Sequence, residues 1–167
     1  MTGEKIEKGF NDQINAELYS AYLYLSMAAY FESLNFQGFA NWMKVQAQEE
    51  VVHAMKFFNH INERNGRVTL KAIDKPPVTW KSPLDAFQKA YQHELLVTGL
   101  INKLVALAQK ENDYPAGVLL QWFVEEQVEE EMNANTISEK LKLAGDSPNI
   151  LFMLDSQLGG RKFTGEE

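Results

Sequence analysis

The chain of 167 residues is long enough to bury a sizeable core, and its 45% apolar and 23% charged residues are typical of a globular protein. It contains no cysteine, which excludes disulfide bonds, thiolate-bound zinc, cysteine-held iron–sulfur clusters and a cysteine nucleophile. The net charge of −7 argues against nucleic acid as a main partner and favours cations. No apolar run approaches the roughly 20 residues of a membrane span, and no secretory signal is evident, so we expect a cytoplasmic protein without a membrane partner.

Prolines and helix-capping residues divide the chain into helices. Ser82-Pro83 and Ser147-Pro148 are typical of an N-cap followed by the first helical residue, and Asp113-Tyr114-Pro115 is a looser form of the same signal. Asn65-Gly66 and Ala144-Gly145 indicate helix ends with a left-handed cap. The expected helices cover residues 4–34, 38–65, 83–111, 115–144 and 148–158, approximately.

The connections between these helices are short, long and short, which predicts an all-α four-helix bundle with one long crossover and a short fifth C-terminal helix. We expect a single domain over residues 1–167. The bundle takes about 4–144, the short helix about 148–158, and a polar tail 159–167.

Each long helix carries an apolar stripe at steps of 3 and 4, and each stripe is interrupted near its middle by side chains that can bind a metal. An isolated buried carboxylate is costly, and no Lys or Arg occupies these stripe positions. Several carboxylates in one core therefore need a shared cationic partner. The interrupting residues are Glu17, Glu50 with His53, Glu94, and Gln127 with Glu130.

The spacing of these residues contains a repeat. Glu17 and Glu50 are 33 residues apart, and so are Glu94 and Gln127. Glu50-x-x-His53 corresponds to Gln127-x-x-Glu130, so an offset of 77 relates the two helical hairpins. Their distances from the interhelical turns place all six residues at one level, which predicts a two-metal site. Four carboxylates balance two divalent cations, and this oxygen-rich set with one imidazole suits iron or manganese and also accepts zinc.

Other residues near this level have two interpretations. Glu49, Glu126 and Glu129 border the site and form either an accessory metal position or an ordinary acidic surface. Tyr24 and Trp122 are either electron donors to a metal-bound oxidant or plain core packing.

The two remaining histidines, His60 and His93, flank the stripes, and we expect both at the surface.

Five segments of the chain match one known family: Asn11 to Tyr24, Gly38 to Met43, Gln48 to Ala54, Asn65 to Val68 and Glu126 to Glu131. Through them the sequence resembles prokaryotic non-haem ferritins over nearly its full length. The resemblance implies iron storage: oxidation of Fe²⁺ to Fe³⁺ by O₂ or H₂O₂ at a di-iron ferroxidase centre within each subunit, and a homo-oligomeric shell of 24 subunits that holds the ferric mineral.

The resemblance also implies roles for individual residues. Glu17, Glu50 and His53 look like the first iron site, and Glu50 would bridge to a second site completed by Glu94 and Glu130. Gln127 looks like a residue that hydrogen-bonds near the first iron. The third iron site found in these ferritins would comprise Glu49, Glu126, Glu129 and Glu130, and Tyr24 and Trp122 match the redox-active aromatic residues.

Related families fit less well. Bacterioferritins carry a second Glu-x-x-His motif and a haem-binding methionine, where this chain has Gln127-x-x-Glu130 and Val51-Val52, so no haem is expected. Rubrerythrins need a cysteine-bound iron, and this chain has no cysteine. DNA-protecting mini-ferritins place their site between subunits, whereas the site predicted here lies among four helices of one chain.

Two functions of other classes use the same residues. A di-iron oxygenase or peroxidase would need an apolar substrate pocket, and no cluster of small residues near the ligands suggests one. A non-catalytic helical interaction module with a buried polar network does not account for the spacing.

Overall fold

The computed structural model describes residues 3–165, which form five helices and no strand. The predicted all-α four-helix bundle with a short fifth helix is confirmed, and every predicted helix end lies within two residues of the observed one. Residues 1, 2, 166 and 167 lie outside the described part, including the last two residues of the predicted polar tail. The helices are α1 (Glu4–Ser33), α2 (Gln37–Glu63), α3 (Pro83–Lys110), α4 (Tyr114–Ala144) and α5 (Pro148–Leu158).

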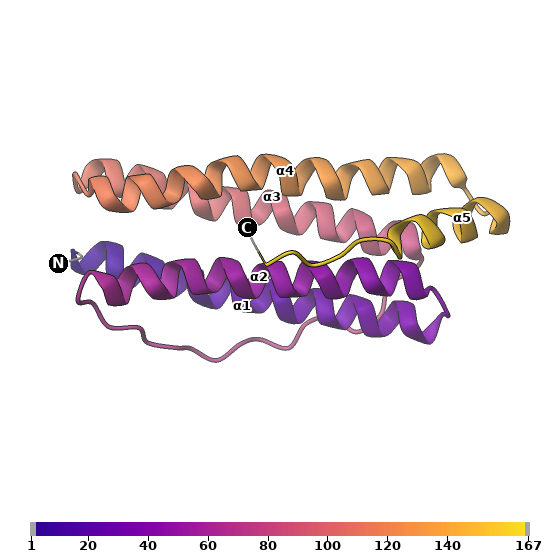
Figure 1. The fold of residues 1–167 in the computed structure, drawn as a ribbon, viewed down its shortest axis with the longest axis horizontal. Coiled ribbons are helices and arrows are strands. Elements are labelled where there is room, and N and C mark those ends of the chain that lie inside the picture. Colours follow the sequence, from indigo (N-terminus) through magenta and orange to yellow (C-terminus); the bar gives the residue numbers. More distant parts are fainter. Residues whose placement is uncertain (1–2, 166–167) are drawn as a thin grey trace.

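The bundle consists of two antiparallel hairpins, α1 with α2 and α3 with α4, that pack against each other (Figure 1). The crossover from α2 to α3 runs the length of the bundle, so α2 and α3 point in the same direction (Figure 1). This topology places the middles of all four long helices at one level, which is the level of the predicted polar residues.

Side chains of α1 hold the crossover in place. The Asn11 side chain donates to the carbonyl of Arg67 at 3.0 Å and accepts from the backbone N–H of Thr69 at 2.7 Å. Farther along, Asn15 donates to the carbonyl of Ala72 at 3.0 Å. These bonds satisfy backbone groups of a segment that has no secondary structure of its own.

The N-caps agree with the sequence at two of three positions. The Ser82 hydroxyl accepts from the backbone N–H of Asp85 at 3.1 Å, and the Asp113 carboxylate accepts from that of Ala116 at 3.1 Å. Ser147 occupies the N-cap position of α5, but its side chain forms no capping hydrogen bond.

The ends of the first three helices depend on asparagines with positive φ. Asn35, Asn65 and Asn112 have φ of 62°, 57° and 53°, in the left-handed region that asparagine tolerates better than most residues. At the end of α2 the left-handed residue is therefore Asn65, and not the glycine that follows it. Gly145, with φ of 56°, ends α4 as expected.

The short helix α5 packs across the start of α2 (Figure 1). A Cβ added at Gly38 would lie 1.6 Å from the carbonyl oxygen of Asp155, so only glycine allows this approach. The Asp155 carboxylate accepts from the backbone N–H of Phe39 at 2.8 Å, which satisfies a donor in the first turn of α2.

Buried apolar side chains form two clusters, one toward each end of the bundle. The cluster near α5 includes Phe31, Phe39 and Phe87. The opposite cluster includes Phe57 and Phe123, whose rings stack with centroids 4.2 Å apart, together with Phe10. Between the two lies a layer of buried polar side chains.

None of the helices formed by residues 3–165 combines the length and the apolar character needed to span a membrane.

Candidate metal centre

The six polar residues predicted to meet in the core are all buried in the structure, with at most 3% of each exposed. They come from all four long helices, because the stripe of each helix faces the bundle axis. Among residues 3–165, no Lys or Arg forms an ion pair within 4.0 Å of the four central carboxylates. The six are Glu17 on α1, Glu50 and His53 on α2, Glu94 on α3, and Gln127 and Glu130 on α4.

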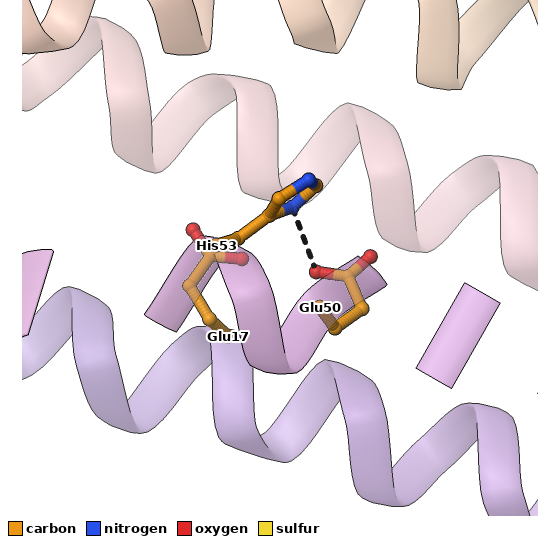
Figure 2. A group of neighbouring side chains, drawn as sticks. All are labelled: Glu17, Glu50 and His53. Atoms are coloured by element: carbon orange, nitrogen blue, oxygen red, sulfur yellow. Dashed lines mark ion pairs between the residues drawn. The ribbon is translucent and has the colours of Figure 1, made fainter. Parts of the chain in front are cut away.

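Glu17, Glu50 and His53 form the first potential metal-binding group. One ligand atom from each lies within 4.8 Å of the others, and Figure 2 shows the three side chains converging from α1 and α2. The Nδ1 atom of His53 is 3.4 Å from the carboxylate of Glu50. The Oε2 atom of Glu17 is buried without a hydrogen-bond partner, as an unfilled ligand position would leave it.

Glu94 lies on the α3 side of the layer and is held by two neighbours. The Tyr24 hydroxyl donates a short hydrogen bond to its Oε1 atom, and the Gln127 amide donates to its Oε2 atom at 3.3 Å. The resemblance placed Gln127 near the first iron, whereas here its contacts are with Glu94, which the same resemblance assigns to the second iron. The amide also donates to the Thr98 hydroxyl at 3.2 Å.

Two glutamines that the sequence reasoning missed also orient the carboxylates. Gln13 donates to Glu17 at 2.8 Å, and Gln46 donates to Glu130 at 2.6 Å and to Glu50 at 3.5 Å. Each glutamine precedes a carboxylate of its own helix by four residues, which places it on the same face one turn away. That repeated Gln-x-x-x-Glu spacing was the signal that could have revealed them.

Burial raises the pKa values of several of these carboxyls. The pKa of Glu94 rises from 4.5 to about 7, chiefly because burial disfavours its charged form. Burial, followed by the charges of neighbouring carboxylates, raises the pKa values of Glu50 and Glu130 well above their usual range. The pKa of the Tyr24 hydroxyl also rises well above its usual value, for the same two reasons.

A second potential group shares His53 with the first. His53, Glu126 and Glu130 offer ligand atoms within 4.8 Å of one another. The Nε2 atom of His53 is buried without a hydrogen-bond partner and lies 4.0 Å from Glu126. The structure thus brings two members of the predicted accessory position, Glu126 and Glu130, to the same histidine.

The other two predicted accessory residues lie differently. Glu129 is exposed, and Glu49 is buried in an ion pair with Arg161 of the C-terminal tail. Neither belongs to the two groups of potential ligands found among residues 3–165. Arg161 was also missed by the sequence reasoning, because a single cation in a polar tail carries no periodic signal.

The aromatic residues lie close to the ligands. The Trp122 ring packs edge-on against His53, with centroids 5.5 Å apart, and Tyr24 contacts Glu94 directly. His60 and His93, which we expected at the surface, are both of intermediate exposure. His93 is only partly exposed, bonds to the Ser20 hydroxyl at 2.7 Å and lies against the Tyr24 ring, and burial lowers its pKa to about 4.

The chemistry of this donor set fits hard or borderline divalent cations. Four buried carboxylates and one imidazole provide oxygen and nitrogen ligands without sulfur. No Lys or Arg of residues 3–165 forms an ion pair with these carboxylates, so a bound cation could balance their charge. The unpartnered Oε2 atom of Glu17 is where a first ligand bond would form at the central group.

Comparison with known proteins agrees with this geometry. A family model described as "Ferritin-like domain" matches residues 7–144. The chain is 45% identical to a bacterial non-heme ferritin of Bacteroides fragilis over 96% of its length and all of that protein, and 35% identical to one of Staphylococcus aureus over 99% of its length and all of that protein.

Solved structures give the same result. An engineered closed form of the Archaeoglobus fulgidus ferritin is 52% identical, with a TM-score of 0.97 over 98% of this chain and all of that one. The open-pore ferritin of the same archaeon, also 52% identical, has a TM-score of 0.96 over 97% of this chain and all of that one. By sequence and by structure, the chain belongs to the ferritin family.

Proposed function

We propose that this protein stores iron, taking Fe²⁺ as substrate, oxidising it to Fe³⁺ at a di-iron ferroxidase centre in each subunit, and holding the ferric mineral in a shell of 24 subunits. Membership of the ferritin family supports iron storage. The ferroxidase activity is inferred from one observation: four carboxylates and an imidazole converge in the core with no Lys or Arg beside them in residues 3–165.

The proposed ligands divide into two sets that share Glu50. Glu17, Glu50 and His53, whose ligand atoms lie within 4.8 Å of one another, would bind the first Fe²⁺. Glu50, Glu94 and Glu130, which are close enough to raise one another's pKa, would bind the second. Carboxylates suit this role because they can bind one metal or bridge two, and can therefore follow the change from Fe²⁺ to Fe³⁺.

The surrounding side chains orient the ligands and manage their protons. Because burial raises the pKa values of Glu50, Glu94 and Glu130, Fe²⁺ competes with protons for their carboxyl oxygens. The Tyr24 hydroxyl can then keep donating to the Glu94 carboxylate, so one oxygen of Glu94 stays fixed while the other binds metal.

In the overall reaction each Fe²⁺ loses one electron to O₂ or H₂O₂. The bundle's part is to hold two Fe²⁺ side by side, to exclude water through the packing of Phe57 and Phe123, and to place Tyr24 and Trp122 within reach. We propose Tyr24 as the aromatic residue that can supply a further electron, since it contacts a ligand directly.

We further propose an accessory iron position at Glu49, Glu126, Glu129 and Glu130. Of these residues, Glu126 and Glu130 already lie close together beside His53. For the full set, Glu129 would have to turn inward and Glu49 would have to exchange Arg161 for metal.

Removing the shared ligand tests the ferroxidase site. In Glu50→Ala, we expect the rate of aerobic Fe²⁺ oxidation, followed by the ultraviolet absorbance of the ferric product, to fall by at least about tenfold because both metal positions lose a ligand. The matched control is Glu63→Ala, which removes an exposed glutamate from the same helix and should leave the rate unchanged. An undiminished rate in Glu50→Ala, with normal helical circular dichroism, would reject the assignment.

A further inference from the structure

The chain beyond α5 returns along α2 toward the middle of the bundle (Figure 1, yellow). The side chain of Asn41 on α2 fixes this tail by donating to the carbonyl of Arg161 at 3.0 Å and to that of Gly159 at 3.4 Å. The tail therefore has a defined position on α2, within reach of the metal centre.

The Arg161 side chain is clamped by three residues of α2. Its guanidinium forms an ion pair with Glu49, donates to the Gln46 side-chain oxygen at 2.8 Å, and lies over the Trp42 ring with its Cζ atom 4.6 Å from the ring centre. The side chains of Arg161 and Glu49 are 21% and 4% exposed. Because Arg161 is largely buried and contacts three side chains of α2, its ion pair with Glu49 stabilises the docked tail more than an exposed surface ion pair would.

This contact determines what Glu49 can bind. Glu49 is the buried member of the predicted accessory position, and a guanidinium already satisfies its carboxylate. A divalent cation that approached the same oxygens would face Arg161 as a competing like charge.

The accessory position has a second, independent sign of a ligand. His53 is 1% exposed, and its Nε2 atom lacks a hydrogen-bond partner while facing the carboxylate of Glu126. An unpartnered nitrogen in that place is accounted for by a cation on the Glu126 side, which is the side that Glu49 would complete.

Arg161 is also linked to the central ligands. Because the Gln46 oxygen accepts from Arg161, its amide nitrogen is turned toward Glu130 at 2.6 Å and Glu50 at 3.5 Å. Docking of the tail thus fixes the orientation of a side chain that contacts two proposed metal ligands.

We propose that Arg161 is a built-in competitor for metal at Glu49. With the tail docked, its guanidinium takes the place of an accessory divalent cation and limits each subunit to the two central metal ions. When the tail detaches, Glu49 becomes available to a third. This inference rests on the proposed function only in assuming that the two central positions bind metal.

The test counts metal ions with a redox-inert probe, so it does not depend on iron oxidation. Zn²⁺ is titrated by calorimetry into assembled, metal-free, full-length protein. We expect two tight sites per chain in the wild type, and in Arg161→Gln a third site at least about tenfold tighter than any third site of the wild type. Lys162→Gln, which removes the neighbouring exposed cation of the tail, should behave as the wild type.

Two further variants separate competition from a structural role. The double variant Arg161→Gln with Glu49→Gln should lose the third site again, and Arg161→Lys, which keeps the charge, should restore exclusion at least in part. The proposal would be overturned if Arg161→Gln and the wild type had equal numbers and affinities of sites, or if all sites of the variant were generally weakened. Neither result would contradict the assignment of the central site. Absence of tight sites in the wild type would instead overturn the proposed function.

Discussion

At the scale of single residues, the central carboxyls lie in an environment that disfavours their charged form unless a cation is bound. Glu94 accepts hydrogen bonds from Tyr24 and Gln127, and both bonds lower its pKa, yet burial outweighs them and raises the pKa to about 7. Burial thus favours the protonated form of Glu94 when no metal is bound.

This protonation has a consequence for stability at different pH values. Between pH 4.5 and about 7, folded metal-free protein keeps the proton of Glu94 that the unfolded chain releases, so the free energy of unfolding must fall as pH rises. The raised pKa values of Glu50 and Glu130 act in the same direction.

We therefore expect the thermal unfolding midpoint of metal-free protein to be higher at pH 5 than at pH 7, as measured by circular dichroism at constant oligomeric state. Zn²⁺ should reverse the order, because metal binding is favoured by deprotonated ligands. Glu94→Gln, which cannot titrate, should show a smaller pH dependence. A metal-free midpoint that rises from pH 5 to pH 7 would contradict the predicted sign.

The residues that the sequence predicted and those it missed differ in a physical way. Glu17, Glu50 and Glu94 interrupt apolar stripes, and a charge in a buried stripe is visible from helical periodicity alone. Arg161 approaches the centre from an irregular tail, and its place depends on how α5 docks on α2, which no local pattern encodes. Gln46 lies between these cases, because its spacing to Glu50 was visible but an amide carries no obligatory charge.

At the scale of helices, the two Ser-Pro motifs provide a matched pair. Ser82 accepts the backbone N–H of Asp85, whereas Ser147 forms no side-chain cap. We expect Ser82→Ala to lower the free energy of unfolding by about 1 kcal/mol, because a backbone donor at the start of α3 loses its acceptor, and Ser147→Ala to change it by a few tenths at most. Thermal midpoints measured at equal protein concentration should show this order, and equal losses in both variants would contradict it.

The helix bounds followed from the sequence because they depend on local chemistry. Proline can occupy only the first turn of α3, α4 and α5, and asparagine or glycine is needed where the chain leaves a helix with positive φ. The path of residues 64–82 was beyond such reasoning, since it depends on tertiary bonds from Asn11 and Asn15 to backbone groups more than fifty positions away.

At the scale of the whole molecule, the single chain exposes several large apolar side chains to solvent. Leu143 at the end of α4 is 87% exposed, and Phe152 and Met153 on α5 are 74% and 62% exposed. Tyr22 and Leu25 on α1 are each about half exposed. Apolar surface of this kind on several sides is typical of a subunit that is covered by its neighbours.

The proposed shell can be tested at this surface. If 24 chains of 19.1 kDa assemble, the wild type should form a particle of about 460 kDa by light scattering after size exclusion. In Phe152→Glu we expect a much smaller particle, because a charge would have to be buried at the contact that covers α5. Gln88→Glu adds the same charge at an exposed polar position of α3 and serves as the control.

Since the proposed ligands of the metal centre all come from one chain, dissociated Phe152→Glu should still bind Zn²⁺ at the central sites. A wild type that runs as a monomer or dimer at every ionic strength would exclude storage in a shell. Retained Zn²⁺ binding in such a protein would favour a di-iron enzyme that works as a small unit.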